Sequence, residues 1–239
     1  MAFEKIVLGN FCILNTTAED LATHLLENLA ARCQRIVFFA NTNFIMTCRN
    51  LLNRMPPDSV LIVNDGVGVD LAALMIARHR FRQNLNGTDF TPYLLRQAGR
   101  PLRVYLLGAK PGVVQRAAEY VHRQLGQQVV GLCDGYGGMQ DASLPSRIAE
   151  SQPDMLLVAL GNPVQEQWIL QHRDVLDVPL VMGVGALFDF WAGNKPRAPR
   201  LIQSLRLEWF YRLCLEPRRL LRRYTIDVVR FFLYCHRYR

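Results

Sequence analysis

Asp65 is the residue whose position in the sequence suggests chemistry most directly. It follows an apolar run of strand length and Asn64, and it precedes Gly66 and a stretch with helical spacing. A carboxylate at the end of a strand can act as a general base toward an acceptor hydroxyl. The same position suits an Asp that caps a helix or stabilises a turn. The sequence alone leaves both interpretations open.

Other polar or small residues follow apolar runs in the same way. Asn86 and Asp89 lie in the turn NGTD, where they either cap the next helix or face a ligand crevice. Asp189 ends the last apolar run, where its carboxylate either accepts hydrogen bonds from a uracil or ribose or stabilises a turn. Gly108 and Gly161 each join a strand to a helix, and free amides at a helix start can bind phosphate. These residues are candidates for a nucleotide site.

Gln165 and Glu166 follow Gly161 and fall in the first turn of the next predicted helix. A polar side chain there can reach a ligand. An acid in the first turn is also common because it complements the helix dipole. A role in the site and a purely structural role therefore both remain open.

The chain lacks the usual metal-binding patterns. It has no D-x-D, H-E-x-x-H or C-x-x-C, and its five His residues are dispersed. We therefore expect neither a catalytic metal nor another cofactor, and arginines would have to balance the charge of a departing diphosphate. Residues 195–239 hold 12 Lys or Arg and 3 Asp or Glu, whereas residues 1–194 hold 16 and 17. Arg197, Arg200 and Arg212 of this basic tail are candidates for binding the acceptor or the diphosphate.

The tail also has the composition of a membrane-surface helix. On a helical projection from residue 218, one side collects Leu220, Leu221, Tyr224, Val228, Phe231 and Phe232, and the arginines fall mostly opposite. Basic amphipathic helices with aromatic residues are typical of the membrane interface. Ile226, Val229 and Leu233 interrupt the polar side. A helix that packs on the body or on a partner subunit is the alternative.

Strand-like and helix-like stretches alternate along residues 1–194, and the strand-like runs are almost wholly apolar. This pattern predicts an α/β fold with a Rossmann-like, mostly parallel sheet covered by helices on both faces. After Gly193 only basic helical stretches remain, split at Glu216–Pro217. We therefore predict a catalytic core over 1–194 and a basic helical, membrane-associating appendage over 195–239. Ligands of such sheets bind outside the carboxyl ends of the strands.

Several function classes fit the sequence poorly. Gly183–Val184–Gly185 does not continue as G-x-G-x-x-G because Phe188 occupies the third glycine position, which disfavours an NAD-type oxidoreductase. The six scattered Cys residues predict reduced thiols and a cytoplasmic compartment. Neither a signal peptide nor an apolar run long enough to span a membrane is evident. A non-catalytic nucleic-acid-binding protein that uses the basic tail remains the alternative, although no RNA- or DNA-binding motif is present.

Long segments of the chain resemble the WecG/TagA/CpsF family, glycosyltransferase family 26. The resemblance runs from about residue 5 to 225, and its specific parts are VNDGVGVDLA, NGTDF, VYLLGAKPGVV, DGYGG, ALGNPVQEQWI, GVGALFDFWAGNKPRAP and LRLEWFYRLCLEPRRLLRRY. It implies an inverting, metal-independent transferase that moves a sugar from a UDP-sugar to a polyisoprenyl-diphosphate-linked saccharide. Products of the family feed wall teichoic acid, common antigen or exopolysaccharide. The resemblance also implies a peripheral position at the cytoplasmic face of the plasma membrane, with an anionic membrane surface and no nucleic acid as partner. A homo-oligomer is compatible with the sequence.

The resemblance also assigns roles to individual residues. It implies that Asp65 is the base, that Gln165 assists catalysis, and that Asn41 belongs to the site. Tyr136 and Asp189 match residues expected near the nucleotide, and Arg197 and Arg212 match arginines of the appendage. Three cations that the family often has are replaced, by Asn84, Val164 and Pro196. The donor sugar, the acceptor and the linkage are therefore left open.

Overall fold

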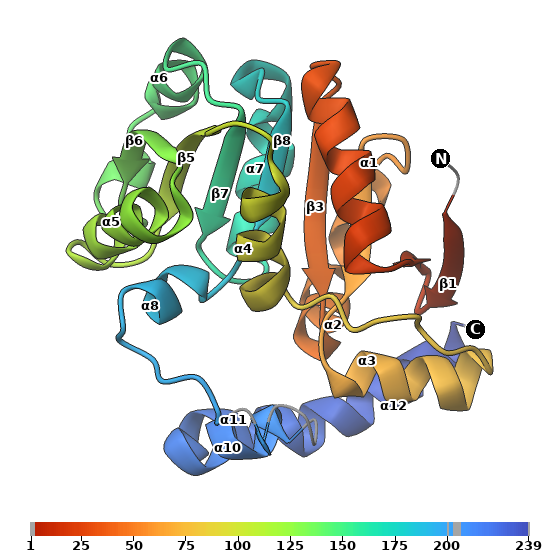
Figure 1. The fold of residues 1–239 in the computed structure, drawn as a ribbon. Helices are drawn as coiled ribbons and strands as arrows, with labels where there is room; N and C mark the ends of the chain where they lie inside the picture. The colour runs from red at the N-terminus through yellow and green to blue at the C-terminus, as the bar shows by residue number, and fades with distance from the viewer. Residues whose placement is uncertain (1–2, 200, 203–206, 239) are drawn as a thin grey trace.

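The structure is a computed structural model that describes residues 3–199, 201–202 and 207–238. Its strands form one sheet in the order β1-β2-β4-β3-β8-β7-β5-β6 (Figure 1). The strands are β1 Glu4–Leu8, β2 Phe11–Asn15, β3 Arg35–Ala40, β4 Val60–Asn64, β5 Arg103–Gly108, β6 Gln128–Cys133, β7 Met155–Ala159 and β8 Leu180–Gly183. Only β1 and β2 pair antiparallel, and every other neighbouring pair is parallel. The predicted mostly parallel α/β sheet is thus confirmed.

Helices connect the strands and cover both faces of the sheet. They are α1 Ala18–Ala30, α2 Thr42–Cys48, η1 Arg49–Arg54, α3 Val67–Ala72, η2 Ala73–Ala77, α4 Gly87–Gln97, α5 Val113–Leu125, η3 Gly138–Gln140, α6 Leu144–Glu150, α7 Val164–Leu176, α8 Leu187–Trp191, α10 Glu208–Leu215, α11 Pro217–Tyr224 and α12 Ile226–Arg237. Apolar residues of α1, α4, α5 and α8 form the core on one face, and those of α2, α3, α6, α7 and α12 form it on the other. Because both faces are covered, the central strands need apolar residues at successive positions.

The helices α10 to α12 lie across the end of the sheet where the parallel strands finish (Figure 1). They are not detached from the core, because Phe231 and Cys235 are fully buried and belong to the same apolar cluster as Phe44 and Ile45 of α2. The break predicted at Glu216–Pro217 is present between α10 and α11. The division of the chain at residue 194 remains a prediction.

The predicted apolar side of the tail packs on the protein. Leu220 and Phe231, which we assign to a membrane-facing side, are buried. Ile226, Val229 and Leu233, which interrupt the polar side, are exposed. Leu220 and Phe231 are 11 residues apart, about three helical turns, so α11 and α12 bury the same side although the helix breaks at Thr225. The assignment of Leu220 and Phe231 to a membrane is therefore wrong, and the alternative of a helix that packs on the body holds for them.

Within the described residues, no helix has both the length and the apolar composition needed to cross a bilayer. All six cysteines are free thiols. Cys48, Cys133 and Cys235 are buried, as expected for Cys used as a small apolar residue.

Candidate functional site

The backbone around Asp65 is fixed by neighbouring strands and loops. The Asp65 N–H donates to the carbonyl of Ala40 at the end of β3 (2.9 Å). Gly66 has φ +89°, a conformation that glycine adopts far more readily than other residues. Its N–H donates to the side-chain oxygen of Asn84 (3.3 Å), whose amide donates to Asp70 (3.3 Å). Asn84 therefore holds the turn that presents Asp65.

The Asp65 carboxylate is partly buried beneath the C-terminal helices. Its Oδ2 accepts a hydrogen bond from Asn41 Nδ2 (3.3 Å), and Asn41 also caps α2 by accepting from the Phe44 N–H (3.0 Å). Burial raises the pKa of Asp65 above its usual range, and this outweighs the Asn41 hydrogen bond and nearby arginines, which lower it. A carboxylate with a raised pKa is a stronger base and suits proton abstraction from a hydroxyl.

Two arginines of the basic tail act electrostatically on this carboxylate. Arg212 on α10 and Arg223 on α11 both lower the pKa of Asp65 electrostatically. The guanidinium of Arg212 also lies over the ring of Phe190 on α8, 5.1 Å from its centroid. Arg223 Nη2 donates to Asn41 Oδ1 (3.5 Å). The structure thus brings Asp65, Asn41 and Arg212 together as predicted, and it adds Arg223.

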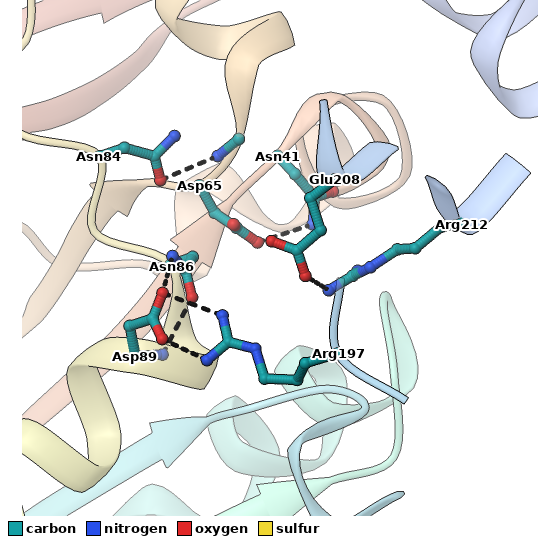
Figure 2. A network of polar contacts seen from close by, with 9 residues as sticks. Asn41, Asp65, Asn84, Asn86, Asp89, Arg197, Glu208 and Arg212 are labelled. Atoms are coloured by element: carbon teal, nitrogen blue, oxygen red, sulfur yellow. Dashed lines mark hydrogen bonds and ion pairs between the residues drawn. The ribbon is translucent and has the colours of Figure 1, made fainter. Parts of the chain in front are cut away.

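Glu208 is a second carboxylate at this site that the sequence analysis missed. Figure 2 shows it between the Asp65 carboxylate and the Arg212 guanidinium. Its Oε1 accepts from Arg212 Nη2 (2.8 Å), and its charge raises the pKa of Asp65. The signal that could have found it is the spacing of Glu208 and Arg212, an i,i+4 pair on one helix face.

Asn86, Asp89 and Arg197 form a separate cluster beside Asp65 (Figure 2). Asn86 caps α4 by accepting from the Asp89 N–H (2.9 Å), as its helix-cap interpretation requires. Arg197 donates both terminal nitrogens to Asp89, one of them at 3.1 Å to Oδ2. Burial alone would raise the pKa of Asp89, but the hydrogen bonds from Arg197 and Asn86 lower it overall. The pair ties the start of the basic tail to α4, and its predicted role in binding a diphosphate stays a prediction.

Gln165 is buried at 2% exposure and bridges two strand ends. Its Oε1 accepts from the N–H groups of Gly161 (3.3 Å) and Gly185 (3.0 Å), and its Nε2 donates to Glu166 (2.8 Å). Asn162 also donates to Glu166 (2.6 Å), yet burial raises the pKa of Glu166 overall. The Gln165 oxygen therefore already has two backbone donors, which is the geometry of a positioning residue.

The remaining nucleotide candidates lie further along the sheet. Gly108 ends β5, where a side chain would collide with the backbone of Ala159, so close packing alone explains this glycine. Tyr136 is 61% exposed after edge strand β6. Because β6 is five strand spacings from β4, Tyr136 and Asp65 are separated by about 24 Å across the sheet. They can contact only different parts of an extended ligand.

Asp189 on α8 is available for a ligand. Its carboxylate is half-buried and makes no hydrogen bond or ion pair with any residue that the structure describes. The aromatic rings beside it pack on one another, with Trp191 stacked on Tyr120 at 5.5 Å between centroids. Arg200 lies outside the described residues, so its predicted role is not addressed. Over residues 3–199, 201–202 and 207–238, no group of three or more His, Cys, Asp or Glu side chains could hold a metal ion, and metal independence stays a prediction.

The sequence of this chain is similar to those of known transferases. The chain is 36% identical over 162 residues to an N-acetylglucosaminyldiphosphoundecaprenol N-acetyl-beta-D-mannosaminyltransferase of Bacillus subtilis (strain 168), which covers 66% of this chain and 62% of the relative. It is 34% identical over 173 residues to the protein of the same name from Staphylococcus aureus (strain NCTC 8325), covering 70% and 66%. The matches thus span slightly less than two thirds of each relative.

A family-level match extends much further along the chain. The pattern of the Glycosyl transferase WecG/TagA/CpsF family matches residues 6–239, which include the Asp65 turn, the Gln165 bridge and all three tail helices. The match therefore covers both the sheet and the helices that lie across its end. This protein belongs to the WecG/TagA/CpsF family of glycosyl transferases.

Proposed function

We propose that the protein transfers a sugar from a UDP-sugar to a polyisoprenyl-diphosphate-linked saccharide, with inversion and without a metal ion. Asp65 removes the proton from the acceptor hydroxyl. The hydroxyl oxygen forms a bond to the anomeric carbon as the bond from that carbon to the UDP oxygen breaks. The proton remains on Asp65, and UDP leaves with the electron pair of the broken bond.

The observation that carries this proposal is the Asp65 carboxylate with arginines at close range. Burial makes Asp65 a stronger base than an exposed carboxylate. Arg212 and Arg223 supply positive charge at the same place, where they can stabilise negative charge on a leaving group or on the acceptor diphosphate. Base and charge stabilisation are thus both provided by this chain's own residues.

The names of the relatives suggest the class of acceptor. Both are named as transferases of N-acetylmannosamine to N-acetylglucosaminyldiphosphoundecaprenol. We extend the lipid-diphosphate acceptor to this chain, together with an N-acetylhexosamine donor. Asn84 and Val164 replace cations of the family pattern, so the donor sugar can differ from that of the relatives. Screening UDP-sugars identifies it.

A lipid-linked acceptor places the reaction at a membrane, and the exposed surface of the tail supports this. Leu221, Ile226, Val229 and Leu233 of α11 and α12 are exposed. Arg222 and Arg230 are exposed beside them. Apolar side chains among basic ones favour a surface with anionic lipids. We place the protein at the cytoplasmic face of the plasma membrane, as a peripheral protein.

Substitution of the base tests the proposal. Asp65→Asn keeps the shape of the side chain but removes the base, so kcat should fall at least about 100-fold while UDP binding by calorimetry is unchanged. Asp58→Asn is the matched control, because Asp58 is exposed near the opposite end of the same strand. Its kcat should equal that of the wild type. Turnover of Asp65→Asn within a few-fold of wild type would show that Asp65 only stabilises its turn.

A further inference from the structure

An apolar helix face lies exposed on the core, immediately after Asp65 in the sequence. The helices α3 and η2 bury one side against the sheet, with Val69, Ala72, Ala73 and Ile76 in the core. The other side is exposed, and it carries Val67 (36%), Leu71 (44%), Leu74 (42%) and Met75 (64%). A cluster of large apolar residues exposed on one face marks a surface that binds a protein, a membrane or a ligand.

A basic segment continues directly from this face. Arg78, His79, Arg80 and Arg82 are all exposed, and no acidic residue occurs between Leu71 and Arg82. Arg82 is partly offset by Asp20, at 3.9 Å between side chains. Arg78 has a left-handed backbone (φ +57°), which turns the chain sharply at the end of η2. The apolar face is therefore bordered by positive charge.

This face belongs to the same end of the molecule as the tail helices. Figure 1 shows α3 and α12 together at that end, and the two helices are in contact. Exposed apolar residues therefore occur on α3, η2 and α12 at the same end of the molecule.

We propose that the α3–η2 surface, defined as Leu71, Leu74, Met75, Arg78 and Arg80, docks on the anionic surface of a lipid bilayer. The arginines match the phosphates of anionic headgroups, and the apolar side chains reach the level of the acyl chains. Docking of this surface does not depend on the proposed transfer reaction. Only its consequence for catalysis rests on that reaction.

Docking of the α3–η2 surface restricts the orientation of the protein on the membrane. A protein held at one helix can still rotate over the membrane, whereas contacts from both the core and the tail restrict that rotation. Because α3 begins two residues after Asp65, docking of α3–η2 places the base near the headgroup level. A lipid-linked diphosphate is held at that depth.

The test measures binding of the full-length protein to vesicles of phosphatidylglycerol and phosphatidylcholine. One variant combines Leu74→Gln with Met75→Gln, and another combines Arg78→Gln with Arg80→Gln. Each arginine near an anionic surface contributes about 1 kcal/mol, so the double Arg variant should bind about 30-fold more weakly. Binding should also weaken for the double apolar variant, and pure phosphatidylcholine should abolish the effect of the arginines.

A matched control removes the same charges elsewhere. Arg96→Gln with Arg123→Gln acts on exposed arginines of α4 and α5, and it should leave vesicle binding near the wild-type value. Vesicle binding by both α3–η2 variants equal to that of this control would overturn the proposal. So would a change in oligomeric state on sedimentation with unchanged vesicle binding, which would identify a self-association surface.

Activity separates this inference from the proposed function. Both α3–η2 variants should transfer sugar to a water-soluble acceptor analogue at the wild-type rate, while transfer to a vesicle-bound acceptor falls. If the wild type transfers no sugar at all, the proposed function fails but the vesicle measurements still decide the docking surface. Equal transfer by variants and wild type to the vesicle-bound acceptor would contradict the orienting role.

Discussion

At the scale of single residues, the Asp65 carboxylate occupies a position that disfavours its own ionisation. Burial and the charge of Glu208 both raise its pKa, and the arginines do not fully compensate. Such a group lowers the stability of the folded protein at neutral pH, since the unfolded chain ionises it more easily. Functional residues are often retained at such a cost in stability.

Asp65→Asn should therefore unfold at a higher urea concentration than the wild type at pH 7. The folded pKa is above the unfolded one, so the wild type loses stability as pH rises from about 4 through the folded value. The advantage of the variant should be present above that value and vanish near pH 4. Urea titrations at several pH values measure this. A variant less stable than wild type at pH 7 would mean that ionised Asp65 stabilises the fold.

Glu208 should set the acid side of the rate profile. Glu208→Gln removes a negative charge that raises the pKa of Asp65. It also removes the ion-pair partner of Arg212, whose positive charge then acts more strongly on Asp65. The acid limb of log kcat/KM against pH should therefore move to lower pH, because that limb reports the free enzyme's base. Asp227→Asn is the control, since it removes a half-buried acid of α12 that pairs with Arg230 (3.8 Å). If the acid limb moves equally in both variants, or in neither, the charge of Glu208 does not control the ionisation of Asp65.

The sequence pointed to Asp65 more readily than to the residues around it. Asp65 stands out because it ends an apolar run before a glycine, and the resemblance added Asn41 and Arg212. Glu208 and Arg223 escaped because one helical stretch carries many charges, and only packing decides which of them face the sheet. Asp89 and Arg197 were both expected to bind a ligand, and they bind each other.

At the scale of the elements, Gln165 joins the ends of β7 and β8 to α7. Gln165→Ala leaves the N–H groups of Gly161 and Gly185 without their acceptor, and a buried unsatisfied group costs about 1–3 kcal/mol. The free energy of unfolding should fall by about 2 kcal/mol or more. Gln167→Ala, at an exposed position of the same helix, should change it little. Unchanged stability of Gln165→Ala with lost activity would instead indicate a direct role in catalysis.

Strands and connecting helices were predictable because apolar runs of strand length leave little choice once both sheet faces are covered. The tail was harder. Its composition predicted helices and their break at Glu216, but whether the apolar side faces lipid or protein depends on the fit of Phe231 against α2. A helical projection does not show that fit.

At the scale of the whole molecule, charge and packing divide the chain differently. Charge separates the basic tail from a neutral body, but Phe231 and Cys235 join the tail to the core. Deletion of residues 195–239 would expose Phe44 and Ile45 and so mix misfolding with loss of function. Point variants on exposed faces are therefore the sharper tools for separating membrane binding from catalysis.

In the proposed reaction, this chain's own carboxylate and arginines perform an inverting transfer without a metal ion. The most direct measurement is NMR of the product formed from a UDP-N-acetylhexosamine and a short-chain lipid-diphosphate saccharide in excess EDTA. We expect a new glycosidic bond whose anomeric configuration is opposite to that of the donor, formed at the rate seen without EDTA. A product that retains the donor configuration, or transfer that stops in EDTA and returns with Mg²⁺, would contradict it.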